Sequence, residues 1–131
     1  MEQVVEVVRA FIYSDDKKFL LLGKRGDIQK FSGMWDLPGC RIAKGESAGE
    51  ALIRGLKDKL NLEVFSYSHI KTEIDRTEDV RCNVHFFWVL PEKLSDLNLN
   101  DANVLEELSW FTNKTMPEYL LHNIKFDDGI Y

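Results

Sequence analysis

The chain has 131 residues, of which 44% are hydrophobic and 30% are charged, and this composition predicts one soluble globular domain spanning residues 1–131. Its 22 acidic and 17 basic residues leave a formal net charge of −5, which argues against a protein that binds nucleic acid through a basic surface. The sequence shows neither a signal-peptide pattern nor an apolar run long enough to span a bilayer. Cys40 and Cys82 are expected to be reduced, which favours a cytoplasmic location.

The first third of the chain predicts strands and turns. Two apolar segments, residues 4–12 and 19–22, flank a polar turn at 15–18, and we expect them to pair as a hairpin. Residues 26–33 are polar and predict a loop. Residues 36–39 predict a short extended piece that ends in a turn, because proline fixes φ and glycine allows positive φ.

The clearest helix signal comes next. Ser47 and Glu50 have the spacing of a capping box. Apolar residues then recur at helical spacing, and Asn61 is a suitable stop. The periodic residues are Leu52, Leu56 and Leu60.

The remainder predicts two strands at residues 64–74 and 81–90 with a turn at 77–79 between them, then a polar loop at 94–103. A short strand is expected at 108–111, and a helix is expected to begin at 117–122, with proline in its first turn. Strands at both ends, with a central and a terminal helix, predict an α/β layered domain.

Three spaced segments carry a family resemblance. The first is Gly33-Met34-Trp35-Asp36-Leu37-Pro38-Gly39, the second is Glu46 followed after seven residues by Arg54, with Leu56 and Leu62 beyond it, and the third is Glu107-Leu108-Ser109-Trp110-Phe111. They resemble the G-x-W-x-L-P-G approach, the Nudix box G-x5-E-x7-R-E-U-x-E-E-x-G-U (U is aliphatic) and the later E-x-x-W-F strand. The chain is thus similar to the Nudix (MutT-like) hydrolases from about residue 4 to 122, and the resemblance implies an α/β/α sandwich with a mixed β-sheet.

The resemblance also implies a reaction. Nudix hydrolases cleave nucleoside diphosphates linked to another group: water attacks a phosphorus while Mg²⁺ or Mn²⁺ neutralises the diphosphate charge. The family holds these metals with the glutamates of R-E-x-x-E-E. Hard divalent cations need converging carboxylate oxygens, and helical positions i, i+3 and i+4 share a face.

This sequence departs from the pattern at those positions. Gly55, Asp58 and Lys59 stand where the family has three glutamates, and Cys40 and Asn61 stand where the box has its two glycines. One carboxylate remains, and an ammonium within ~4 Å of a divalent ion repels it by several kcal/mol at an effective dielectric of about 20. We therefore expect diphosphate hydrolysis to be weak or lost. The alternatives are a non-catalytic Nudix-fold module that binds a nucleotide or a protein partner, and a structural domain without a ligand.

Glu46, Arg54 and Asp58 are the candidate catalytic residues. Glu46 and Asp58 are also the candidate ligands of Mg²⁺ or Mn²⁺ if the protein is active, and no cofactor is expected otherwise. Each has a structural alternative: a charge that favours the helix dipole for Glu46, and a surface ion pair for Arg54 with Asp58. Glu50 and Glu107 are the carboxylates that would have to compensate for the lost ligands.

The resemblance also suggests residues that bind a nucleotide-like small molecule. The candidates for contact with substrate are Arg25, Trp35, Gly39 and Lys59. The structural alternatives are packing for Trp35 and Phe31, turn geometry for Gly39 and a solvated side chain for Lys59. The three histidines, His69, His85 and His122, are too scattered in the sequence to predict a metal cluster. Neither the substrate nor the oligomeric state can be read from the sequence.

Overall fold

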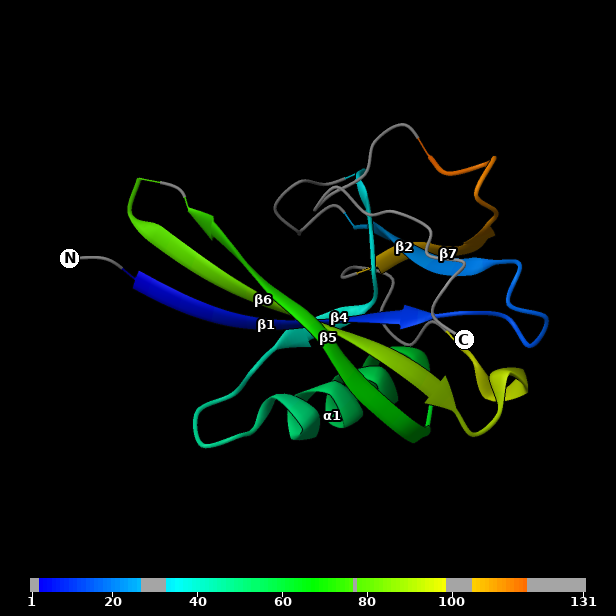
Figure 1. The fold of residues 1–131 in the computed structure, drawn as a ribbon, viewed down its shortest axis with the longest axis horizontal. Helices are drawn as coiled ribbons and strands as arrows, with labels where there is room; N and C mark the ends of the chain where they lie inside the picture. The colour runs from blue at the N-terminus through cyan, green and yellow to red at the C-terminus, as the bar shows by residue number, and fades with distance from the viewer. Residues whose placement is uncertain (1–2, 27–32, 77, 99–104, 118–131) are drawn as a thin grey trace.

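The computed structural model describes residues 3–26, 33–76, 78–98 and 105–117, and within these ranges the strands form two sheets (Figure 1). One is four-stranded, with β4 (Gly39–Arg41), β1 (Gln3–Ile12), β6 (Val80–Pro91) and β5 (Val64–Arg76) in that order. The other is three-stranded, with β3 (Trp35–Asp36), β2 (Leu20–Arg25) and β7 (Leu105–Phe111) in that order. The helix α1 (Ala48–Leu60) lies against the first sheet, and a single 3-10 turn, η1 (Leu94–Asp96), follows β6.

The four-stranded sheet is mixed. β1 and β6 run parallel from the pair Gln3–Val80 to the pair Ile12–Val89, whereas β4 pairs with β1 and β5 pairs with β6 in antiparallel fashion. The predicted α/β class with a mixed sheet is therefore confirmed, as are the strands predicted at 4–12, 64–74, 81–90 and 108–111. Several predicted segments lie largely outside the described residues. They are residues 27–32 of the loop predicted at 26–33, Thr77 of the turn at 77–79, residues 99–103 of the loop at 94–103, and residues 118–122 of the helix at 117–122.

The hairpin predicted for the first two strands is wrong. β1 and β2 are joined by a turn in which Lys17 has φ 62°, but within the described residues they share one bridge, Tyr13 to Leu20, and then enter different sheets. β1 pairs with β6 from Gln3 to Ile12 and with β4 at Val7–Arg9, whereas β2 pairs with β3 and β7 in the second sheet.

Both ends of α1 are capped. The Ser47 hydroxyl accepts a hydrogen bond from the Glu50 backbone N–H at 3.1 Å, and the Glu50 carboxylate accepts one from the Ser47 N–H at 3.0 Å, which confirms the capping box. Asn61 adopts the left-handed conformation with φ 55° and ends the helix as predicted. These caps fix where the helix begins and ends, and its buried leucines set which side faces the sheet.

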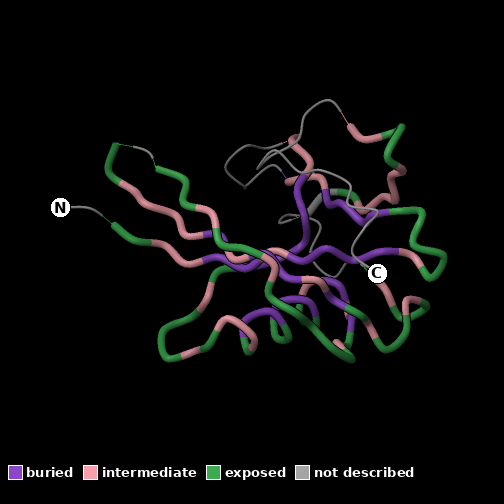
Figure 2. The backbone as a smooth tube through the Cα atoms, in the orientation of Figure 1, coloured by how far each residue is buried: buried purple, intermediate pink, exposed green. Residues whose placement is uncertain are grey.

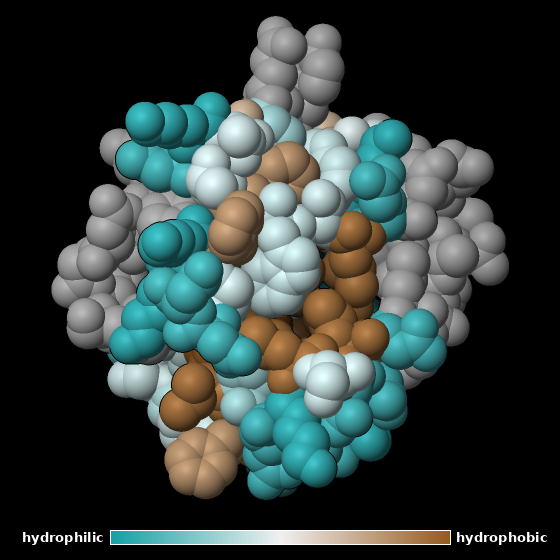
Figure 3. Space-filling view, turned by 90° about the vertical axis from the view of Figure 1, so that its right-hand side faces the viewer, coloured by the Kyte–Doolittle hydropathy of each residue, from teal (hydrophilic) through white to brown (hydrophobic). Residues whose placement is uncertain are grey.

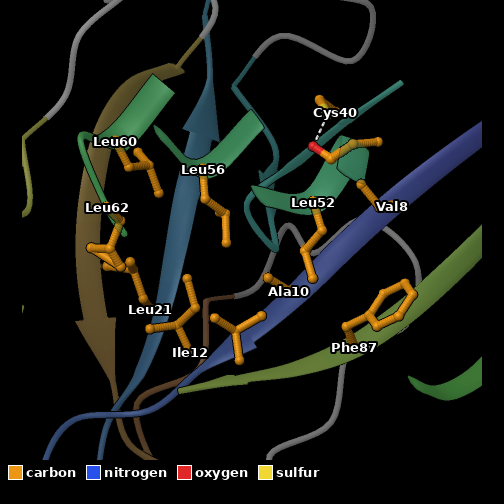
Figure 4. Packing of buried hydrophobic residues seen from close by; sticks show 12 residues of the cluster. Val8, Ala10, Ile12, Leu21, Cys40, Leu52, Leu56, Leu60, Leu62 and Phe87 are labelled. Atoms are coloured by element: carbon orange, nitrogen blue, oxygen red, sulfur yellow. Dashed lines mark hydrogen bonds between the residues drawn. The ribbon is translucent and has the colours of Figure 1, made fainter. Parts of the chain in front are cut away.

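The core consists of two apolar clusters. In the first, Leu52, Leu56 and Leu60 point from α1 toward β1 (Figure 4). A fully buried leucine contributes roughly 1.5–3 kcal/mol, so this row anchors the helix. The second cluster is contributed by strands of both sheets and comprises Phe11, Tyr13, Leu20, Leu22, Leu37, Val84 and Phe86.

Burial is uneven along the sheet. Buried residues concentrate in the second half of β1, in the middle of β6 and in β2, whereas most of the edge strand β5 is exposed (Figure 2). The face seen in Figure 3 carries apolar side chains gathered around a hollow with hydrophilic residues around them. No helix in the described part of the chain is long and apolar enough to cross a membrane.

Candidate functional site

Glu46 and Arg54 form a two-pronged ion pair that joins the loop before α1 to the helix. Arg54 Nε lies 2.7 Å from Glu46 Oε2, and Arg54 Nη2 lies 2.9 Å from Glu46 Oε1. The Ala43 N–H also donates to Glu46 Oε1, at 2.9 Å, and Arg54 Nη2 donates to the Arg41 carbonyl at 3.0 Å. The Arg54 hydrogen bonds, together with the Ala43 N–H, lower the pKa of Glu46 to about 2. Both oxygens of Glu46 are therefore engaged within the protein.

Asp58 lies at the outer side of this pair. Its carboxylate is 4.0 Å from Arg54 Nη1, and its side chain is 66% exposed. The structure thus brings all three candidate catalytic residues together, with Arg54 between the two carboxylates. This geometry also matches the structural alternative, an i,i+4 surface pair between Arg54 and Asp58.

Gly55 is buried against Cys40. A Cβ atom added at Gly55 would overlap Cys40 Sγ and lie 3.0 Å from Cys40 Cβ. The thiol is held in place because it donates a hydrogen bond to the Ala51 carbonyl at 3.2 Å (Figure 4). The cysteine sulfur therefore occupies the space that a glutamate at position 55 would need.

Lys59 reaches from α1 to β4. Its Nζ donates a hydrogen bond to the Gly39 carbonyl at 2.7 Å. Burial lowers the pKa of Lys59, and the positive charges of Arg9, Arg25 and Arg54 lower it further. Gly39 itself has no room for a side chain, because a Cβ there would overlap the Val8 carbonyl oxygen of β1. This close approach of β4 to β1 fixes the carbonyl to which Lys59 binds.

Asp36 lies among the same cations. It is 1% exposed, and its Oδ2 lies 3.2 Å from Arg9 Nε and 3.5 Å from Arg25 Nη1. Its Oδ1 accepts a hydrogen bond from the Leu37 N–H at 2.8 Å. Burial and the neighbouring charge of Arg9 lower the pKa of Arg25. We call Arg9, Arg25, Arg54 and Lys59 the basic cluster.

Sequence reasoning missed two of the residues that build this site, Arg9 and Asp36. The available signal was an arginine in the middle of the otherwise apolar strand predicted at 4–12. A half-buried cation in a strand needs an acidic partner, which Asp36 supplies.

The remaining residues singled out from the sequence lie outside the basic cluster. Trp35 packs edge-on against Phe111, with ring centroids 5.0 Å apart, as its packing alternative predicted. Glu50 is engaged in the capping box, and Glu107 is an exposed residue of β7 opposite Lys24. Phe31 lies outside the described residues.

The donor groups of this site do not fit a divalent-metal centre as they stand. In the described part of the chain, no three His, Cys, Asp or Glu side chains are placed to hold a metal ion. Both Glu46 oxygens accept hydrogen bonds from Arg54 or Ala43, and the Gly39 carbonyl is bound by the Lys59 ammonium. Metal ligation by Glu46 and Asp58 stays a prediction.

Comparison with known proteins defines the class to which this fold and site belong. The family model described as NUDIX domain matches residues 5–128. The chain is 34% identical over 103 residues to a CTP pyrophosphohydrolase of Escherichia coli (strain K12), covering 79% of this chain and 74% of that protein. The chain therefore belongs to the Nudix family.

Solved structures confirm the fold. A MutT NUDIX hydrolase from Burkholderia pseudomallei superimposes with a TM-score of 0.82 at 20% identity, covering 92% of each chain. The MutT protein from Methanosarcina mazei Go1 gives a TM-score of 0.75 at 20% identity, covering 90% of this chain and 88% of the other.

Proposed function

We propose that this Nudix protein binds the phosphates of a nucleotide at the basic cluster and hydrolyses diphosphate bonds weakly or not at all. The observation that carries the proposal is the 2.7 Å hydrogen bond from Lys59 Nζ to the Gly39 carbonyl. A backbone carbonyl is the kind of hard oxygen ligand that Mg²⁺ uses, and here an ammonium group occupies it.

The charge balance of the site favours an anion. The basic cluster contributes four positive charges, and it forms ion pairs with the carboxylates of Asp36, Glu46 and Asp58. Lys59 is half-buried, and its pKa is lowered by burial and by the cations around it. A phosphate would relieve this repulsion, and guanidinium and ammonium groups bind phosphate oxygens through short charge-assisted hydrogen bonds.

The same residues disfavour hydrolysis. Cleaving a diphosphate requires neutralisation of the developing charge and a water molecule oriented for attack, which metal-bound carboxylates supply in this family. Gly55 carries no side chain, and Glu46 is engaged with Arg54. Without these carboxylates, bound nucleotide is expected to persist.

The relative from Escherichia coli suggests the first ligand to examine. Because that protein is a CTP pyrophosphohydrolase, CTP leads the panel, followed by the other nucleoside triphosphates and nucleoside diphosphates linked to a sugar. A cytoplasmic location is part of the same proposal, supported by Cys40 and Cys82, which are both free thiols.

The test is a calorimetric titration of the full chain with CTP and the rest of the panel, in EDTA and again with Mn²⁺, together with an assay for released phosphate and pyrophosphate. We expect binding in EDTA, weakened at least tenfold by Lys59→Met, and weak or undetectable release. Lys57→Met, which removes a lysine from the exposed side of the same helix, is the matched control and should bind like the parent. Binding that requires Mn²⁺ and leads to turnover at the rate of the relative would overturn the proposal.

A further inference from the structure

A second polar cluster lies on the face of the four-stranded sheet that α1 covers, and it shares no residue with the basic cluster. His69 Nε2 and His85 Nδ1 each lie 2.9 Å from the hydroxyl oxygen of Thr72. On its other side, His85 Nε2 lies 2.7 Å from Glu6 Oε2. Asn83 donates a hydrogen bond to the second oxygen of Glu6 at 3.0 Å. We call His69, Thr72, His85 and Glu6 the histidine cluster.

A bulge in β5 brings the cluster together. The register between β5 and β6 shifts between His69, opposite Phe87, and Lys71, opposite Phe86. In a regular strand, residues three apart point to opposite faces. The extra residue turns both Ile70 and Lys71 toward the Phe86 face, where Ile70 packs in the second core cluster and Lys71 lies over the Phe86 ring at 5.0 Å. His69 and Thr72 therefore share the opposite face, and bulges commonly re-aim side chains in this way.

The Glu6 carboxylate can only accept, so His85 Nε2–H donates to it. In the tautomer that carries its ring hydrogen at Nε2, His85 directs the Nδ1 lone pair at the Thr72 hydroxyl, and His69 Nε2–H then donates to the Thr72 oxygen. Metal ligation by His69 Nε2 uses the other tautomer of that ring, with its hydrogen at Nδ1. Hydrogen bonds from Asn83 and His85 lower the pKa of Glu6, which keeps it charged. The ring of His69 is held edge-on to the buried Phe87, with centroids 5.3 Å apart.

We propose that the histidine cluster is a binding site for a divalent transition-metal ion such as Zn²⁺ or Cu²⁺. His69 Nε2 and His85 Nδ1 are the ligands, and the ion lies near the present position of the Thr72 hydroxyl, on which both nitrogens converge. Imidazole nitrogen suits these ions, at bond lengths of about 2.0–2.1 Å, so the rings close in as the hydroxyl turns aside.

Glu6 completes the arrangement that metal-binding histidines favour. A ligating imidazole commonly donates its other N–H to a carboxylate, which fixes the ring and makes the ligating nitrogen more basic. The side chains of His85 and Glu6 are 23% and 42% exposed, and His69 and Thr72 are also exposed, so an ion has access from solvent. Mg²⁺, which prefers oxygen ligands, is not expected to bind here.

The test is a titration of the full, EDTA-stripped chain with Cu²⁺, the ion that binds tightest to such donors in the first-row series. We expect His69→Ala and His85→Ala each to raise the dissociation constant at least tenfold, and Glu6→Gln to raise it roughly 10–100-fold. His122→Ala, a change at the third histidine of the sequence, is the matched control and should bind like the parent. Equal Cu²⁺ binding by the parent and His69→Ala, or loss of binding in His122→Ala, would overturn the proposal.

Electron paramagnetic resonance gives a second, independent measurement. The parent with one equivalent of Cu²⁺ should show couplings to two imidazole nitrogens, and His69→Ala should show coupling to one. Circular dichroism of each variant verifies that it is folded. A parent spectrum with a single imidazole nitrogen contradicts the site even if all variants bind copper.

Discussion

Cys40 and Gly55 compete for the same space, because the sulfur of Cys40 fills the volume that any side chain at position 55 would need. The sulfur also donates to the Ala51 carbonyl and lies 3.7 Å from Arg54 Nη2. Two departures from the Nudix box, Cys40 in β4 and Gly55 in α1, are thus explained by one packing contact. The loss of a glutamate at 55 cannot be reversed without changing position 40.

This packing predicts that Gly55→Ala lowers the stability of the protein, which is the opposite of the usual effect of replacing a helix glycine with alanine. In an ordinary helix interior, replacing glycine with alanine stabilises by roughly 1 kcal/mol. We expect Gly55→Ala to destabilise this protein by about 1–3 kcal/mol in urea unfolding, because the added methyl group overpacks the site. In a Cys40→Gly background, which removes both the sulfur and the Cβ of position 40, the same change should be neutral or stabilising. If Gly55→Ala stabilises both backgrounds equally, the two side chains do not compete.

A metal site should be recoverable with three substitutions. From the sequence alone, Gly55→Glu with Lys59→Glu should raise the affinity for Mn²⁺. The structure adds that Cys40→Gly must accompany them, since the side chain introduced at position 55 would otherwise meet the thiol. We expect the triple variant to bind Mn²⁺ more tightly than the double variant, measured by the loss of the free-ion resonance signal. A triple variant that binds Mn²⁺ no better than the parent shows that the site is misplaced.

The Glu46–Arg54 pair predicts a pH-dependent contribution to stability. The folded-state pKa of Glu46 is about 2, below its ordinary value of 4.5, so the unfolded chain binds the proton more readily. The stabilisation is present above pH 4.5 and is lost as the pH falls toward 2. Glu46→Gln should therefore lower the free energy of unfolding at pH 7, with a difference from the parent that shrinks through this acid window. Glu92→Gln, at an exposed glutamate, serves as the comparison and should show no such trend.

Lys59 predicts a second pH dependence, at the alkaline end. Its folded-state pKa lies below the ordinary value of 10.5, so the unfolded chain binds more protons between the lowered pKa and pH 10.5. The stability of the parent relative to Lys59→Met should therefore increase as the pH rises through that window. Urea unfolding at several pH values from 7 to about 10 measures the difference, and a constant difference would mean that the ammonium is well solvated.

Local signals were sufficient for the helix. Ser47, Glu50 and Asn61 act within one or two turns, so their roles follow from spacing alone, and the structure confirms them. The chain path after β1 was not predictable in the same way, because it depends on β2 pairing with β3 and β7, which come much later in the chain, in a second sheet. A polar turn between two apolar segments fits a hairpin and a change of sheet equally well.

Only the part of the candidate site that depends on local spacing could be predicted from the sequence. Glu46, Arg54 and Asp58 share one loop and helix, so the box pattern brought them together correctly. Arg9 joins them only through the pairing of β1 with β4, and Asp36 through β3. His69 and His85 meet because a bulge changes the side-chain alternation of β5, and no sequence pattern marked that bulge.

Strand β1 contributes Glu6 to the histidine cluster and Arg9 to the basic cluster. Side chains alternate along a strand, and the β1–β6 register has no shift, so these two side chains lie on opposite faces of the sheet. Three residues of extended chain separate their Cα atoms by about 10 Å. At that separation, with no shared partner, substitutions at the two positions should have additive energetic effects. The affinity for copper can thus be measured in a variant that has lost nucleotide binding, and the affinity for nucleotide in a variant that has lost copper binding. Each affinity should equal that of the protein with both sites intact.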